Sequence, residues 1–213
     1  MTGCGGGNSH PTPPTTTRAS APSPRRPFYP KIDDRERAAL ADVGLLRATP
    51  PRLRAACAKA AAHTEWTVLC PTLTPGGRLA ISAVSGVTAR SDDFGAGYEI
   101  SIDSAGLREK GAPDPGHWTI AAGTPGAMRD QLTAFGHSKP VTRRRVRIGD
   151  VQVTRFREPD YGAFPGVYGG HVVYQWMQGR AVLQVSVHGD AHERLLRGLV
   201  RLLSRGPSPN PSG

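Results

Sequence analysis

The sequence lacks any long apolar run: no stretch approaches the roughly 18 consecutive apolar residues that a membrane-spanning helix requires. Apolar residues make up only 38% of the chain, because 26 Gly and 20 Pro are present and concentrate towards its ends. The middle is closer to ordinary composition and is long enough for one domain with a sizeable core. We therefore expect a single domain at 33–205, between a disordered Gly/Pro/Ser/Thr tether at 1–32 and a disordered tail at 206–213.

Motifs of catalysis and metal binding are also missing. The serine-hydrolase G-x-S-x-G, the metalloprotease H-E-x-x-H and the phosphate-binding GxxxxGK[ST] do not occur. Cys57 and Cys70 have no CxxC partner, and a strand-to-helix break is expected between His188 and His192. The sequence therefore predicts no catalytic residue, no metal site and no cofactor, and it favours a non-enzymatic protein.

Lysine is scarce, and arginine supplies most of the formal net charge of +10. Arginine bias follows from a GC-rich genome, which is the simpler explanation, but the charge also suits an anionic partner. Arg143, Arg145 and Arg147 alternate along one face of a predicted hairpin. They are a candidate contact for an anionic membrane surface, the alternative being a solvated polar face. Nucleic acid is disfavoured because no aromatic residues are interleaved with the arginines.

The first residues suggest a lipid anchor. Met1-Thr2-Gly3-Cys4 resembles the end of a bacterial lipobox, in which a small residue precedes the cysteine that receives the lipid. Residues 5–30 form a Pro-rich, semi-rigid spacer of the kind that separates lipid from domain in such lipoproteins. The resemblance, to bacterial and in particular actinobacterial lipoproteins, implies lipidation of Cys4, an extracytoplasmic location and a hydrophobic signal segment upstream. The alternative is a disordered start of a cytosolic protein.

Cys57 and Cys70 offer a test of the compartment. Cys57 lies in PPRLRAACAKAAAHT, an alanine-rich helix with prolines suited to its first turn, and Cys70 ends the β-like run WTVLC. A helix packed on the following strand would bring the pair within disulfide range. The other interpretation is two small buried thiols.

The remaining pattern predicts an α+β fold, an antiparallel β-sheet with N-terminal helices and a C-terminal amphipathic helix. A short helix is expected in DDRERAALADVGLL, including Leu45 and Leu46. A second capped helix is expected from Asp190, with Glu193 completing a D-x-x-E box. Strands are expected at 66–70, 78–86, 97–104 and 117–123, with hairpins turning at Gly149-Asp150 and Gln178-Gly179.

Two segments carry a second resemblance. WTVLCPTLTPGG and GGHVVYQWMQGRAVLQVSVHG, with the leucine-rich helix after them, resemble a small extracytoplasmic domain of bacterial lipoproteins and membrane-tethered regulators. The periplasmic lipoprotein-carrier fold is a curved-sheet relative. This resemblance implies a location and a fold, and it transfers no catalytic residue.

The loop EPDYGAFPGVYGG places Tyr161, Phe164 and Tyr168 among glycines and prolines. Such aromatics either close over an apolar ligand or complete the core. We expect a domain that binds an unidentified ligand or protein partner at the cell envelope. The alternatives are a cell-envelope hydrolase with an unrecognised site and a cytosolic basic protein that binds nucleic acid.

Overall fold

The computed structural model describes residues 25–89, 97–104, 106, 116–134, 142–157, 171–188 and 192–210. These form a seven-stranded antiparallel sheet in the order β3-β4-β5-β9-β8-β7-β6 and a two-stranded sheet, β1-β2. The strands are β1 (Leu45–Ala48), β2 (Leu73–Pro75), β3 (Ile81–Ala89), β4 (Tyr98–Ser104), β5 (His117–Gly123), β6 (Thr142–Ile148), β7 (Val151–Arg157), β8 (His171–Gln178) and β9 (Ala181–His188). The helices are α1 (Asp34–Ala41), α2 (Pro51–His63), α3 (Pro125–Ala134) and α4 (Glu193–Leu203), with a 3-10 turn η1 (Gly77–Leu79). The predicted α+β class is confirmed.

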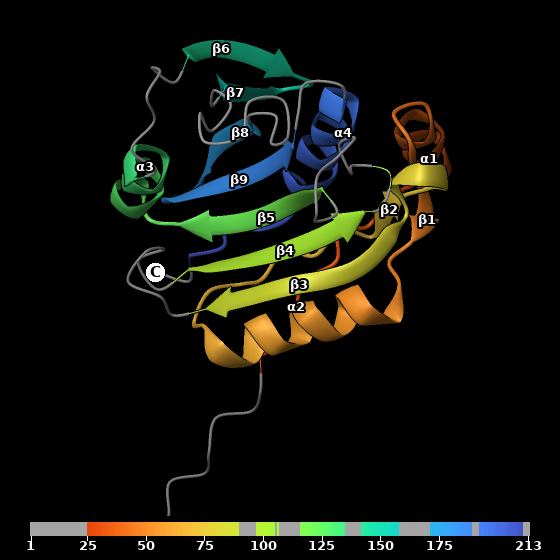
Figure 1. The fold of residues 1–213 in the computed structure, drawn as a ribbon, viewed down its shortest axis with the longest axis horizontal. Coiled ribbons are helices and arrows are strands. Elements are labelled where there is room, and N and C mark those ends of the chain that lie inside the picture. Colours follow the sequence, from red (N-terminus) through yellow and green to blue (C-terminus); the bar gives the residue numbers. More distant parts are fainter. Residues whose placement is uncertain are drawn as a thin grey trace, which may run out of the picture.

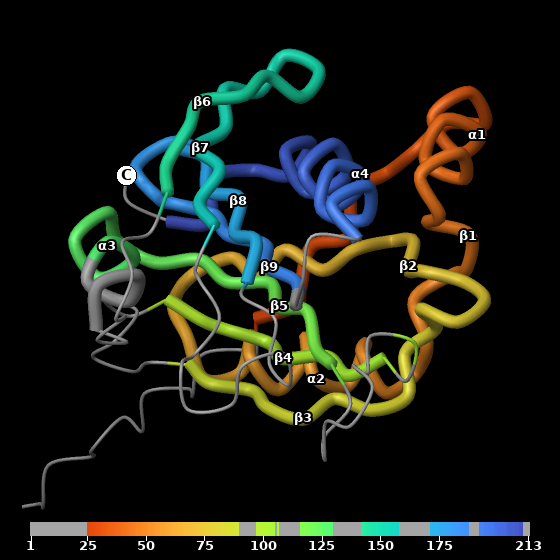
Figure 2. The backbone as a smooth tube through the Cα atoms, turned by 45° about the horizontal axis from the view of Figure 1, so that its top comes forward, coloured from red at the N-terminus to blue at the C-terminus, as the bar shows by residue number. Residues whose placement is uncertain are grey.

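Helices α2 and α4 pack on one face of the large sheet (Figure 1). Helix α3 packs on the opposite face of the same sheet, near one end. The first face carries the main core, to which the sheet and both helices contribute fully buried side chains: Leu53, Ile100, Trp118, Leu183 and Leu199. A smaller cluster joins α3 to the second face: Ala121, Met128 and Val182. Figure 2 shows α4 between the sheet and α1, so α4 is covered on both sides.

The hairpin of β6 and β7 has the register that the sequence predicts. Ile148 pairs with Val151 and Val146 pairs with Val153 across the turn at Gly149-Asp150. Gly149 has φ 58°, a left-handed conformation that glycine adopts without steric cost. Local turn chemistry and alternation together determine this register.

The hairpin of β8 and β9 turns one residue later than predicted. Gln178 pairs with Ala181, so the two turn residues are Gly179 and Arg180 rather than Gln178 and Gly179. Gly179 has φ 65° and therefore occupies the first turn position, as Gly149 does in the other hairpin. The predicted core face is nevertheless correct, and Trp176 is 3% exposed.

Helix α1 is shorter than predicted. Asp33 and Glu36 form a capping box at its start, but Gly44 adopts φ 91° just beyond its end. The following residues 45–48 form β1, which pairs with β2, so the prediction of a helix through Leu45 and Leu46 is wrong. The glycine reverses the chain before the two leucines, and tertiary pairing then overrides their helix propensity.

The expected strand WTVLC is largely wrong, because only Leu69 makes an isolated bridge, with Phe28. Its amide groups donate to scattered acceptors rather than to a neighbouring strand. Leu69 N–H donates to the Tyr98 hydroxyl at 2.9 Å, and Thr67 N–H donates to the Pro209 carbonyl at 2.7 Å. Residues 66–70, the crossing segment, are thus extended chain whose backbone amides bond to other parts of the protein.

One further strand boundary differs from the prediction, and one helix is additional. Strand β3 begins at Ile81, after the 3-10 turn, so the strand expected at 78–86 lies further along the chain. Helix α3 was not predicted, although Thr124 accepts from the amide of Ala127 at 3.3 Å and Pro125 occupies the first turn.

Helix α4 begins at Glu193, with His192 as its N-cap and no side-chain capping bond. The predicted N-cap Asp190 lies outside the described residues. The carboxylate of Glu193 accepts instead from Tyr174 and Arg155. The predicted leucine face is buried against the sheet, and Gly198 allows α4 to approach Leu45 of β1 closely.

Both ends of the described chain hydrogen-bond to one segment. Phe28 N–H donates to the Val68 carbonyl at 2.8 Å, and its carbonyl accepts from Cys70 N–H at 2.9 Å. Pro209 accepts from Thr67 in the same segment. Residues 25–32 and 206–210 thus make defined contacts with the body, while the boundaries of tether, domain and tail stay predictions.

Candidate ligand-binding face

The second face of the large sheet is unusually polar, for a reason visible in its strands. In β4 and β5 apolar and polar residues alternate, so the side chains opposite the core are those of Glu99, Ser101, Asp103, His117 and Thr119. Strands β9 and β8 continue the alternation across the sheet with Gln184, Ser186, Gln175 and His171. We call these nine residues the polar face.

Hydrogen bonds join neighbouring strands across the polar face. Thr119 and Ser186 hydroxyls lie 2.7 Å apart, and the Gln175 amide donates to Gln184 Oε1 at 2.7 Å. Thr119, Gln184 and Ser186 are each no more than 6% exposed. Buried polar groups cost stability unless they are paired, so these cross-strand bonds allow a polar surface to persist in the middle of a sheet.

Two histidines meet at one end of the polar face. His117 opens β5 and His171 opens β8, and their Nε2 atoms lie 3.2 Å apart with ring centroids at 5.2 Å. Asp103 pairs with His117 on the neighbouring strand and accepts from the Ser85 hydroxyl at 2.7 Å. Burial lowers the pKa of His117, and the charge of Asp103 acts in the opposite sense.

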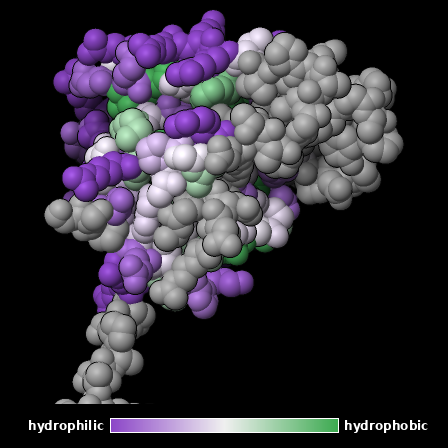
Figure 3. Space-filling model, turned by 90° about the vertical axis from the view of Figure 1, so that its left-hand side faces the viewer, coloured by the Kyte–Doolittle hydropathy of each residue, from purple (hydrophilic) through white to green (hydrophobic). Residues whose placement is uncertain are grey.

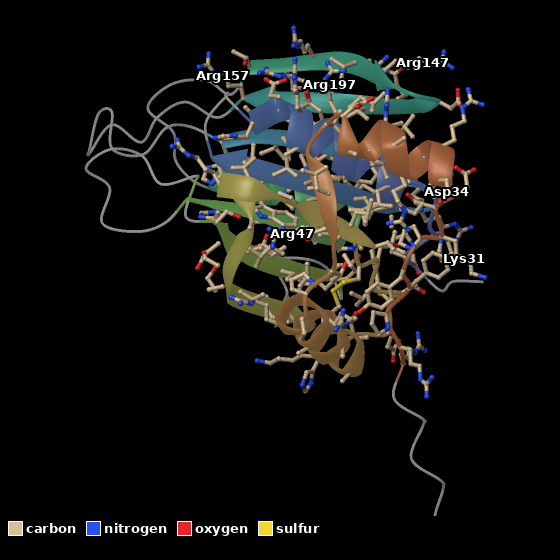
Figure 4. The ribbon with its side chains drawn as sticks, turned by 90° about the vertical axis from the view of Figure 1, so that its right-hand side faces the viewer. Lys31, Asp34, Arg47, Arg147, Arg157 and Arg197 are labelled. Carbon is tan, nitrogen blue, oxygen red and sulfur yellow. A yellow bond between two sulfur atoms is a disulfide. The ribbon has the colours of Figure 1, made fainter. Side chains whose placement is uncertain are left out.

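A row of exposed arginines and a groove beside it lie at the opposite end of the polar face. Arg143, Arg145 and Arg147 are exposed along β6, which confirms the predicted polar face of that hairpin, and Arg143 lies 5.9 Å from the ring centroid of Phe156. Arg145 also lines a groove of about 530 Å³, together with Asp150, Gln152, Thr154, Gln175 and Met177. Asp150 lies 3.7 Å from the guanidinium of Arg147. Figure 3 shows hydrophilic residues gathered along this upper part of the molecule, and Figure 4 shows Arg147 and Arg157 there.

A partly buried ion pair between Arg155 and Glu193 joins α4 to the core face, away from the polar face. Glu193 accepts from Arg155 Nε at 3.1 Å and from the Tyr174 hydroxyl at 2.8 Å. Burial alone would raise the pKa of Glu193, but these hydrogen bonds and the nearby arginine charges lower it overall. Burial and the bond to Glu193 raise the pKa of Tyr174. The cluster positions the first turn of α4.

Cys57 and Cys70 lie at disulfide-bonding distance, with Cα atoms 6.2 Å apart, and Figure 4 shows the bond in yellow. Both side chains are fully buried between α2 and the crossing segment. Of the two interpretations left open by the sequence, the structure shows the bridge.

The other predicted site residues fall outside the described part of the chain: Cys4, Tyr161, Phe164 and Tyr168. Sequence reasoning missed the polar face. The alternation within β4 and β5 signals half of it, but the meeting of His117 and His171 depends on β9 lying between β5 and β8.

Comparisons place this chain with no known family. No protein-family model, curated protein or solved structure matches it. Within the described residues no helix is long and apolar enough to cross a membrane. Among the described side chains, no group of three or more His, Cys, Asp and Glu is placed to hold a metal ion.

Proposed function

We propose that this chain is a non-enzymatic binding domain of an exported lipoprotein, held at the cell envelope by a lipid on Cys4. The sequence motif around Cys4 and the Pro-rich spacer after it support the anchor. The disulfide of Cys57 and Cys70 supports export, because such bonds persist mainly in oxidising compartments.

The observation that carries the binding role is the row of exposed arginines at the β6 edge. Arg143, Arg145 and Arg147 lie exposed on one face of the strand. Arg145 also lines a groove of about 530 Å³ together with amide and hydroxyl side chains and the carboxylate of Asp150. Arginine forks suit phosphate groups, so the surface fits the headgroups of an anionic membrane. Each arginine near such a surface contributes about 1 kcal/mol.

The placement of the spacer is compatible with this contact. The described chain starts, in red in Figure 1, at the end of the molecule opposite β6. A body of this size is about 40 Å across. Residues 5–24 would span about 60 Å if extended at about 3.1 Å per residue, enough to let the β6 edge turn towards the bilayer.

Fractionation of a bacterial host that expresses the gene with its upstream region tests the anchor. Wild-type protein is expected in the membrane fraction and to incorporate labelled fatty acid, whereas Cys4→Ala is expected to lose both. The Cys57→Ala/Cys70→Ala variant, which keeps Cys4, is the matched control. Equal partitioning of Cys4→Ala and wild type would contradict the anchor.

Vesicle co-sedimentation tests the surface separately, with Cys4→Ala protein and phosphatidylglycerol vesicles at low salt. Replacing Arg143, Arg145 and Arg147 by Gln is expected to weaken partitioning about a hundredfold, from about 3 kcal/mol in total. The control replaces Arg35, Arg37 and Arg47, which are exposed on α1 and β1 and carry the same charge. Equal loss in both variants would show that net charge, rather than this edge, governs binding.

A further inference from the structure

His117 and His171 approach each other although their strands are not neighbours. Strand β9 lies between β5 and β8, so the two backbones are about 9.6 Å apart. Their Nε2 atoms are nevertheless only 3.2 Å apart. Both rings must therefore reach over β9 from opposite sides and point their outer nitrogens at one place.

The separation of these nitrogens suits two ligands of one metal ion. At zinc–nitrogen distances of about 2.0–2.1 Å, two ligands of a tetrahedral ion lie about 3.3 Å apart. Imidazole nitrogen is a preferred ligand of Zn²⁺ and of the neighbouring divalent transition metals. Without an ion, the same distance lets one ring donate a hydrogen bond to the other.

The surroundings add one feature of a metal site. On the far side of His117, Asp103 supplies a carboxylate held by Ser85. Carboxylates that act on a ligating histidine raise its basicity as a ligand.

We propose that His117 and His171 bind a divalent transition-metal ion of the zinc class through their Nε2 atoms. The described side chains provide these two ligands. This inference is independent of the lipid anchor and of the β6 edge. It adds a cation site at the other end of the polar face.

Metal titration of the full chain, without a histidine tag, tests the site. Zn²⁺ is added in competition with a chromogenic chelator, and Co²⁺ is added as a visible probe of tetrahedral coordination. One equivalent per chain is expected, with a rise in melting temperature that increases with metal concentration, because the ion binds the folded state. Absence of stoichiometric binding at neutral pH would overturn the proposal.

Variants locate the ion. His117→Gln and His171→Gln keep a neutral hydrogen-bonding group but remove the ligand, so each is expected to weaken Zn²⁺ binding by more than about tenfold. His63→Ala, at an exposed position on α2, is the control and should bind as wild type does. Wild-type affinity in His117→Gln and His171→Gln would overturn the site, and metal-free melting curves verify that each variant folds.

Discussion

The disulfide between Cys57 and Cys70 allows a quantitative test of how the N-terminal part is stabilised. The bridge joins residues 13 apart in sequence, which closes a short loop in the unfolded chain. The loss of chain entropy for a loop of this length corresponds to about 3 kcal/mol at 25 °C. Removing the bridge should therefore reduce the free energy of unfolding by about 3 kcal/mol and lower the melting temperature by about 6–12 °C.

The fold itself should survive reduction. Leu53 and Ala60 of α2 are fully buried on the same core independently of the bridge, and a reduced cysteine still packs as a small apolar side chain. The loss should thus appear as a shift of the urea midpoint with one cooperative transition.

The assay is urea unfolding of Cys4→Ala protein with and without reductant, beside the Cys57→Ala/Cys70→Ala variant, which should not respond to reductant. Mass spectrometry of non-reduced, alkylated protein checks the bond directly. Two free thiols in exported protein would refute the bridge. A confirmed bridge whose reduction changes stability by less than about 1 kcal/mol would refute the loop-entropy reasoning.

Three other substitutions test separate parts of the structure. Because Glu193 has a lowered pKa in the folded state, its ionised form stabilises the protein above the ordinary pKa of a glutamate, and this contribution disappears as the pH falls through the folded value. Glu193→Gln should cost about 1.5–3 kcal/mol at pH 7 and much less near pH 3 in urea unfolding; an equal cost at both would contradict this assignment. Gly149→Ala should reduce the free energy of unfolding by about 1–2 kcal/mol through its left-handed φ alone. Gly179→Ala should reduce it further, because its Cβ would also collide with Ser208. Equal losses of stability measured by calorimetry would contradict the contact with Ser208. Gly198→Ala should lower the melting temperature despite alanine's better helix propensity, because a Cβ there would lie 2.8 Å from a methyl group of Val43. A higher melting temperature would show that α4 can shift away from this contact.

The parts of the fold that the sequence predicts are those determined locally. The β6–β7 register follows from Gly149 and from valine–isoleucine alternation within a dozen residues. The α4 leucine face follows from helical periodicity, although its first turn does not, because Glu193 is drawn to Arg155 and Tyr174 from distant strands.

Elements whose hydrogen-bond partners are distant could not be predicted. WTVLC has β-forming composition, yet the amide of Leu69 donates to the hydroxyl of Tyr98 from β4 rather than to the backbone of a neighbouring strand. The histidine pair depends on strand order in the same way: β5 and β8 each begin with a histidine, but nothing local places β9 between them. Periodicity gives the face of a residue, and topology decides its neighbours.

Both ends of the described chain attach to residues 67–70, Phe28 through Val68 and Cys70, and Pro209 through Thr67. If Cys4 is anchored, a pulling force reaches the body through residues 25–28, which bond to Glu65, Val68 and Cys70. The disulfide holds Cys70 on α2, so the segment that receives these bonds stays attached to the body while they are stretched.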